Sequence, residues 1–108
     1  MDRAELSPVA REALQLMADA IRVGRLRRGW TVESLAERVG VSRPTMMKIE
    51  RGDPGVAVGT VLDAAALVGV PLFDVDAPTR ARHQAHLSRE LSLLPAAARP
   101  RRTVSDDF

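Results

Sequence analysis

The amino-acid sequence predicts an all-α fold, and three kinds of observation support this prediction. Apolar residues recur three and four positions apart over much of the 108-residue chain, which is the spacing of one helix face. Hydroxyl residues precede several of these runs, where they cap helix N-termini, and glycines follow them, where they end helices. Aromatic residues make up only 3% of the chain, so the core must be built from aliphatic side chains and methionine.

Two short helices joined by a tight turn are predicted in the centre of the chain. Thr31 and Ser42 are good N-caps for helices over residues 32–39 and 43–51. Gly40 separates these helices, because a left-handed turn residue costs little only when it has no Cβ. The packing positions are Leu35, Ala36, Val41, Met46 and Ile49. Two short helices that cross closely at such a turn form a helix-turn-helix.

Further helices are predicted on both sides of this motif. The first spans residues 9–28, and Gly24 within it would allow another helix to approach closely. A fourth helix spans residues 58–68, residues 70–73 form a short fifth helix or a turn, and a sixth helix spans residues 78–94. The expected apolar positions are Ala10, Ala13, Leu14, Met17 and Ile21 in the first helix, Val61, Leu62, Ala65 and Val68 in the fourth, and Trp30 and Phe73 at the edges of the core.

Charge is distributed unevenly along the chain. The formal net charge is only +2, but residues 22–51 contain eight basic and three acidic residues, a local charge of +5. Residues 52–79 contain four aspartates and no basic residue. A basic motif followed by an acidic segment fits a protein with one face for phosphates and another turned away from them.

Several functional classes lack support in the sequence. The chain has no cysteine, no apolar run of membrane-spanning length and no signal-peptide pattern at its start, so we expect a cytoplasmic protein. His83 and His86 are three residues apart but have no partner motif, so they indicate no metal site. No nucleophile with a paired base and no phosphate-binding loop is visible, so we expect neither enzymatic activity nor a cofactor.

The helix-turn-helix and its flanks resemble the Xre family of phage-repressor-like regulators. The resemblance rests on the motif itself, on I-E-R-G at residues 49–52, and on flanking residues 21–31 (I-R-x-x-R-x-x-R-G-W-T) and 66–73 (A-L-V-G-V-P-L-F). It implies a five-helix domain over residues 17–75 that binds DNA, preceded by an N-terminal helical extension of residues 1–16. In place of the glutamine that the family often has after Thr31, this chain has a valine.

Within this family the chain looks most like HipB-like antitoxins. The shared features are residues 43–59 (R-P-T-M-M-K-I-E-R-G-D-P-G-V-A-V-G), residues 70–74 (V-P-L-F-D), a leucine-rich helix and a basic tail ending in S-D-D-F. Such proteins repress their own operon and bind a HipA-like kinase toxin. The alternatives are a stand-alone Xre-type repressor, from a prophage or a metabolic operon, and a protein-interaction module that does not bind DNA.

The resemblance also assigns expected roles to single residues. The helix over residues 43–51 would enter the major groove with its N-terminal end toward the bases. Arg43, Lys48 and Thr45 are the expected base contacts. The expected phosphate contacts are Ser42, Thr31, Arg22 and Arg51. The operator would be a near-palindrome of double-stranded DNA, because regulators of this type act as dimers on two-fold sites.

We expect the C-terminal part of the chain to contact the protein partners, which are a second copy of the chain and a kinase toxin. Residues 76–94 form a helix whose leucine stripe either pairs with a second copy of the chain or packs on its own domain, and we favour a homodimer. The interface residues would be Leu87, Leu91 and Leu94. Residues 95–108 are expected to be a flexible tail, because prolines interrupt them and they lack periodicity. The expected contacts to a kinase toxin are Asp106, Asp107 and Phe108.

Overall fold

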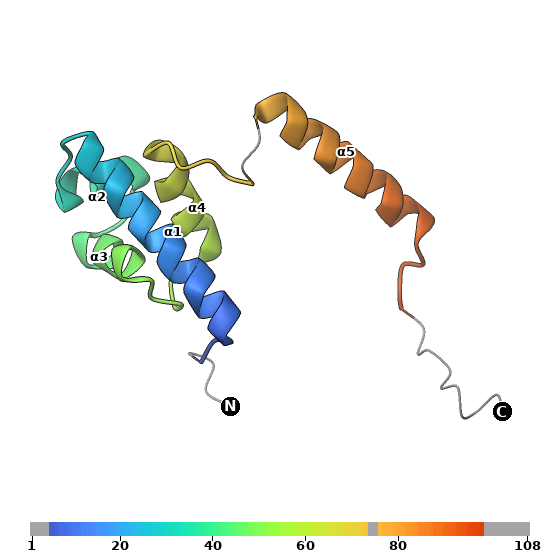
Figure 1. Cartoon of the computed structure of the whole chain (residues 1–108), viewed down its shortest axis with the longest axis horizontal. Coiled ribbons are helices and arrows are strands. Elements are labelled where there is room, and N and C mark those ends of the chain that lie inside the picture. The colour runs from blue at the N-terminus through green and yellow to red at the C-terminus, as the bar shows by residue number, and fades with distance from the viewer. Residues whose placement is uncertain (1–4, 74–75, 99–108) are drawn as a thin grey trace. The chain divides into compact units, whose positions relative to one another are not determined.

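The computed structural model describes residues 5–73 and 76–98, and these residues form five α-helices and no strand (Figure 1). The helices are α1 Pro8–Arg27, α2 Val32–Val39, α3 Arg43–Arg51, α4 Val58–Leu67 and α5 Ala77–Leu93. The chain divides into two compact units, Met1–Asp74 with α1–α4, here called the helix-turn-helix unit, and Val75–Phe108 with α5, here called the α5 unit. The predicted all-α fold is confirmed.

Local sequence signals set the limits of the helix-turn-helix. The hydroxyl of Thr31 accepts a hydrogen bond from the amide of Ser34 at 3.0 Å, and the hydroxyl of Ser42 accepts one from the amide of Thr45 at 3.2 Å. Each bond satisfies an amide that has no partner inside its helix. At the other end of α2, Gly40 has φ = 87°, a left-handed conformation that favours glycine. The predicted bounds of both motif helices are confirmed.

The core of the helix-turn-helix unit is aliphatic. Helix α3 packs against α1 and α2, and α4 packs against the same two helices. The residues buried in this cluster are Ile21, Leu35, Ala36, Met46, Ile49, Val61, Ala64, Ala65 and Val68. Trp30 is partly buried and packs against the cluster, as predicted, and the guanidinium carbon of Arg38 lies 4.0 Å from the centre of its ring.

Gly24 permits the close contact between α1 and the end of α4. A Cβ built on Gly24 would lie 2.7 Å from the carbonyl oxygen of Val68 and 2.8 Å from its Cβ. Neither atom belongs to a flexible side-chain end, so a larger residue would force the backbones apart. The prediction that this glycine admits a neighbouring helix is confirmed.

A buried ion pair ties α1 to α3. Nε of Arg25 donates to Glu50 Oε2 at 2.7 Å, and Nη2 donates to Glu50 Oε1 at 2.9 Å. The remaining nitrogen, Nη1, donates to the carbonyl oxygen of Trp30 at 2.9 Å. The two charged side chains are only 9% and 8% exposed. Because this fork has a fixed geometry, it sets where the last turn of α3 lies against α1.

Two expectations about packing are wrong, and one alternative that the sequence left open is decided. The inward stripe of α4 follows Val61, Ala64, Ala65 and Val68, and Leu62 lies off this stripe and is 38% exposed. For residues 70–73 the prediction left a short helix or a turn open, and the structure shows a bend and a turn, with Phe73 at φ = 61°. Phe73 is 86% exposed, so it is not a core residue.

The first turns of α1 are also more exposed than expected. Ala10 and Ala13 are exposed, and the buried residues of this helix begin at Ala18. The reason is length, since α1 has 20 residues whereas α3 and α4 have 9 and 10. At a rise of about 1.5 Å per residue, a helix this long extends beyond its shorter partners.

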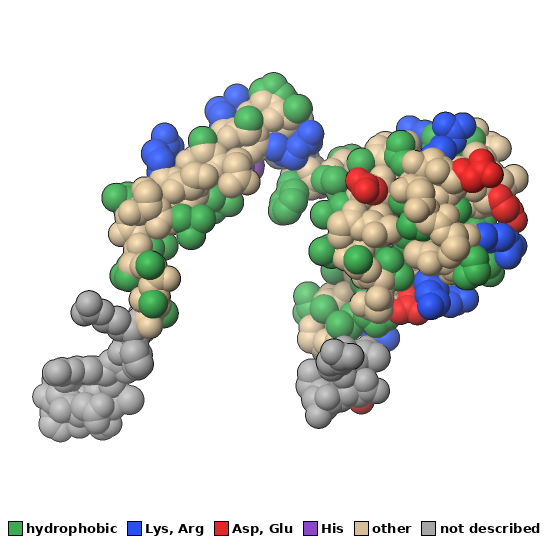
Figure 2. Space-filling model, turned by 180° about the vertical axis from the view of Figure 1, so that it is seen from behind, with side chains coloured by type: hydrophobic (Ala, Val, Ile, Leu, Met, Phe, Trp, Pro, Cys, Tyr) green, Lys and Arg blue, Asp and Glu red, His purple; other side chains and the backbone are tan. Residues whose placement is uncertain are grey.

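Helix α5 has no buried residue. Its N-cap is Asp76, whose carboxylate accepts a hydrogen bond from the amide of Thr79 at 2.8 Å. Figure 2 shows hydrophobic side chains gathered along the C-terminal half of this helix. Leu87 is 51% exposed, Leu91 70% and Leu94 60%.

Candidate nucleic-acid interface

The orientation of α3 follows from which of its residues are buried. Met46 and Ile49 face the core and are 0% and 2% exposed. Arg43 and Lys48 are exposed, and Thr45 is half-buried. Residues at these helical spacings lie on the part of α3 that the core leaves uncovered. The three side chains predicted to contact bases therefore lie on accessible parts of one short helix.

The hydroxyls at the start of α3 are connected to each other. Ser42 Oγ accepts a hydrogen bond from the Thr45 amide and donates one to Thr45 Oγ1 at 3.0 Å. Pro44 lies in the first turn, where its missing N–H removes no helical hydrogen bond. This pairing holds the rotamer of Thr45 at the N-terminal end of the helix, where the helix dipole favours an anion.

Arg43 is held by two neighbouring side chains. Its Nε donates to Glu33 Oε1 at 2.5 Å, and its Nη1 donates to Met47 Sδ at 3.2 Å. The pKa of Glu33 lies below its ordinary value, chiefly because its own backbone N–H bonds the carboxylate and also because of the Arg43 hydrogen bond. The ion pair is exposed, with 54% and 56% of the two side chains accessible, so solvent screens it.

Lys48 lies at the edge of a hollow next to α3. The hollow has a volume of about 310 Å³, and the turn after α3 and the first residues of α4 complete its wall. Its lining residues are Val41, Thr45, Lys48, Asp53, Gly55, Val56, Ala57 and Thr60. The N-cap position of α4 is Ala57, which lines the hollow and forms no side-chain hydrogen bond that caps the helix.

These features match a known family. A family model described as a helix-turn-helix domain matches residues 16–77. The chain belongs to this helix-turn-helix family. Neither the comparison with curated proteins nor that with solved structures gives a match. Membership supports an Xre-like helix-turn-helix regulator that binds DNA.

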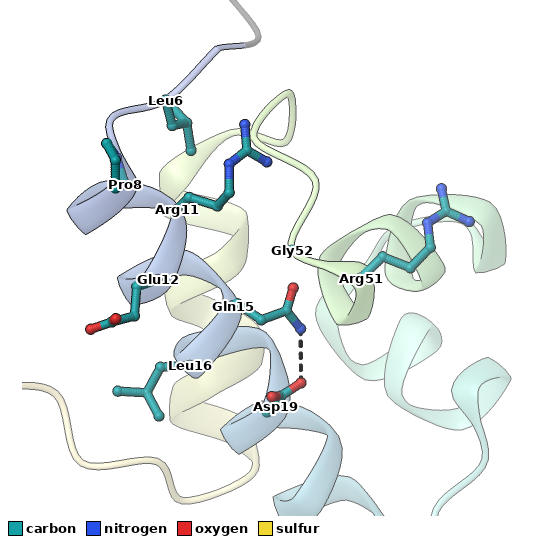
Figure 3. A pocket seen from close by; sticks show the side chains of 9 residues that line it. All are labelled: Leu6, Pro8, Arg11, Glu12, Gln15, Leu16, Asp19, Arg51 and Gly52. Atoms are coloured by element: carbon teal, nitrogen blue, oxygen red, sulfur yellow. Dashed lines mark hydrogen bonds between the residues drawn. The ribbon is translucent and has the colours of Figure 1, made fainter.

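The four predicted phosphate contacts of this helix-turn-helix protein lie in four places. Thr31 caps α2, Ser42 caps α3, and Arg22 is an exposed residue of α1. Arg51 is at the other end of α3, where it lines a hollow of about 640 Å³ with residues of α1 (Figure 3). In that view the Gln15 side chain donates to Asp19, and the Arg51 side chain extends away from both. Arg51 therefore lies apart from the N-terminal end of α3.

Sequence reasoning missed the side chains that hold these residues in place. Glu50 was part of the I-E-R-G match, but its partner Arg25 lies 25 positions earlier, so no local pattern joins them. Glu33 carries only the local signal of an acidic residue in the first turn of α2, which does not indicate a partner. No local pattern joins Glu33 to Arg43 either, because they are ten positions apart on different helices.

The remaining predicted sites concern the C-terminal part of the chain. Leu87, Leu91 and Leu94 are all exposed within the α5 unit. Asp106, Asp107 and Phe108 lie outside the described residues. Within residues 5–73 and 76–98, no group of three or more His, Cys, Asp or Glu side chains is arranged to hold a metal ion. No helix in this part of the chain combines the length and apolar character that a membrane span requires.

Proposed function

We propose that the protein is a sequence-specific DNA-binding repressor that reads its operator with Arg43, Lys48 and Thr45. The observation that supports this most strongly is the anchoring of α3. Its buried residues and the Arg25–Glu50 ion pair fix the helix, while the three polar side chains stay accessible. A rigid helix with exposed donors is what base recognition in the major groove requires.

We also propose that the repressor acts as a homodimer through α5. Isolated helices of this length are marginal in water, and most helical stability in proteins comes from packing of an apolar face. Within its own unit α5 has no buried side chain, and its residues Leu87, Leu91 and Leu94 form an apolar stripe at helical spacing. Pairing with a second copy would remove this stripe from water.

Selection of bound duplexes from a random pool tests the repressor proposal. The enriched sites are expected to be near-palindromes with half-sites about 34 Å apart, which is one helical turn of DNA.

Light scattering tests the dimer with Leu91→Asp, which would place an unpaired charge in the apolar interface. Monomeric Leu91→Asp with retained helicity would support the dimer, and a wild-type protein that is monomeric at high micromolar concentration would exclude it.

The biological role we propose is that of an autorepressing antitoxin paired with a HipA-like kinase toxin. This rests on the resemblance of residues 43–59 and 70–74 to HipB-like antitoxins. Deleting residues 103–108 is expected to leave operator binding unchanged and to weaken association with a co-expressed kinase of that type. Full co-purification of the truncated protein would show that the tail is not the contact. Sequence-specific binding without any kinase partner would favour a stand-alone repressor, and failure to bind any DNA would favour a protein-interaction module.

A further inference from the structure

The carboxylate of Glu33 joins the N-terminal ends of the two motif helices. It lies in the first turn of α2 and accepts the Nε hydrogen bond of Arg43, which lies in the first turn of α3. The bridge combines a carboxylate at a helix N-terminus with a charge-assisted hydrogen bond. In the structure this bond orients the guanidinium of Arg43 without any ligand.

The atoms that hold Arg43 are not those that a base would use. A guanidinium carries five N–H groups, and Glu33 takes the one on Nε while Met47 Sδ takes one on Nη1. The remaining N–H groups on Nη1 and Nη2 stay available for the two acceptors of a guanine edge. An arginine held in one rotamer loses less conformational freedom when it binds than a freely rotating one.

The same carboxylate has a second effect on DNA. The N-terminal end of a helix ordinarily attracts a phosphate, and Thr31 and Ser42 mark two such ends in this motif. At α2 this position holds the charge of Glu33, which repels an approaching phosphate. The repulsion acts on every sequence alike, whereas the orientation of Arg43 helps only where Arg43 finds its base.

We propose that Glu33 is a specificity-determining residue, which holds the Arg43 guanidinium for base recognition and weakens binding to DNA that offers Arg43 no base contact. This role rests on the proposed function. Removing the charge of Glu33 is expected to strengthen binding to random duplex and to relax the preference at the base pair that Arg43 reads. Glu33 is thus a positioning residue, acting on sequence preference through Arg43.

Glu33→Gln and Glu37→Gln form a matched pair for the test. Both remove one negative charge from an exposed position of α2, but only Glu33 bonds Arg43 in the structure. Each variant, the wild type and Arg43→Ala are used to select sites from a random duplex pool, and affinities are then measured on selected and random duplexes. For Glu33→Gln the ratio of selected to random affinity is expected to fall by up to about fivefold, and for Glu37→Gln by less than about twofold.

The base position at which preference is lost identifies the mechanism. Glu33→Gln is expected to relax the same base pair as Arg43→Ala, whereas unchanged preference there, or an equal loss with Glu37→Gln, would overturn the role. Circular dichroism checks folding, and Glu33→Asp, which keeps the charge but is shorter, is expected to relax that base pair without strengthening random binding. A wild-type protein that enriches no sequence would instead refute the proposed function, and the role of Glu33 with it.

Discussion

Breaking the buried Arg25–Glu50 ion pair is predicted to destabilise the helix-turn-helix unit severely. Glu50→Ala leaves the guanidinium of Arg25 buried without its carboxylate, and Arg25 is only 8% exposed. Removing one partner of such a pair costs about 3–5 kcal/mol. A unit of this size has a free energy of unfolding of roughly 4–10 kcal/mol, from about 0.05–0.15 kcal/mol per residue. The loss is therefore a large share of the total.

Urea unfolding followed by the fluorescence of Trp30 measures this loss. Trp30 is the single tryptophan of the chain, and its carbonyl accepts a hydrogen bond from Arg25, so the signal reports on the affected unit. Glu37→Ala, an exposed change on α2, is the control and is expected to shift the free energy of unfolding by less than about 0.5 kcal/mol.

A double variant distinguishes the cost of an unpaired buried charge from the cost of lost packing contacts. Arg25→Met with Glu50→Leu removes both charges, so its free energy of unfolding is expected to return close to that of the wild type. It should remain about 1 kcal/mol lower, because the Trp30 carbonyl is left without its donor. Two results would refute the reasoning. One is a loss below about 1 kcal/mol for Glu50→Ala, and the other is a double variant no more stable than the single one.

Two further predictions follow from single contacts. Gly24→Ala is expected to lower the free energy of unfolding by about 1–3 kcal/mol, because its Cβ would meet the Val68 carbonyl oxygen and Cβ; an unchanged urea midpoint would contradict this close packing. The α5 helix is expected to lose helicity in acid, since the Thr79 side chain and then the Thr79 amide bond the Asp76 carboxylate and hold its pKa below the ordinary 3.8. This stabilisation is present above the ordinary value and disappears as the pH falls through the lowered pKa. Asp76→Asn keeps a capping oxygen but does not titrate, so circular dichroism should show a smaller loss of helicity in acid for this variant. An identical acid transition in the variant and the wild type would exclude the contribution of Asp76.

The sequence predicted those parts of the fold that depend on neighbouring residues. The motif helices begin after Thr31 and Ser42 and end at glycines, because capping and left-handed turns act within about four residues. The burial of Met46 and Ile49 followed from the same local spacing. These features explain why the fold class and the helix bounds could be predicted without a structure.

The errors and omissions concern contacts between distant residues. Leu62 was expected to face the core next to Val61, but the packing of α4 against α1 and α2 buries Ala64 instead. Phe73 was expected in the core, and the turn that ends the helix-turn-helix unit leaves its ring exposed. The Arg25–Glu50 and Glu33–Arg43 pairs required the tertiary arrangement of helices that no single segment specifies.

The most direct test of the central claim compares Arg43→Ala with Arg51→Ala on selected and random duplexes over a range of salt concentrations. The structure holds Arg43 at the N-terminal end of α3, and Arg51 is at the opposite end of the same helix. Arg43→Ala is expected to cost about 1–3 kcal/mol on the selected duplex and much less on the random one. Arg51→Ala is expected to weaken binding to both alike and to reduce the salt slope by about one unit. Equal losses on both duplexes for Arg43→Ala would contradict the claim that α3 reads base sequence through this residue.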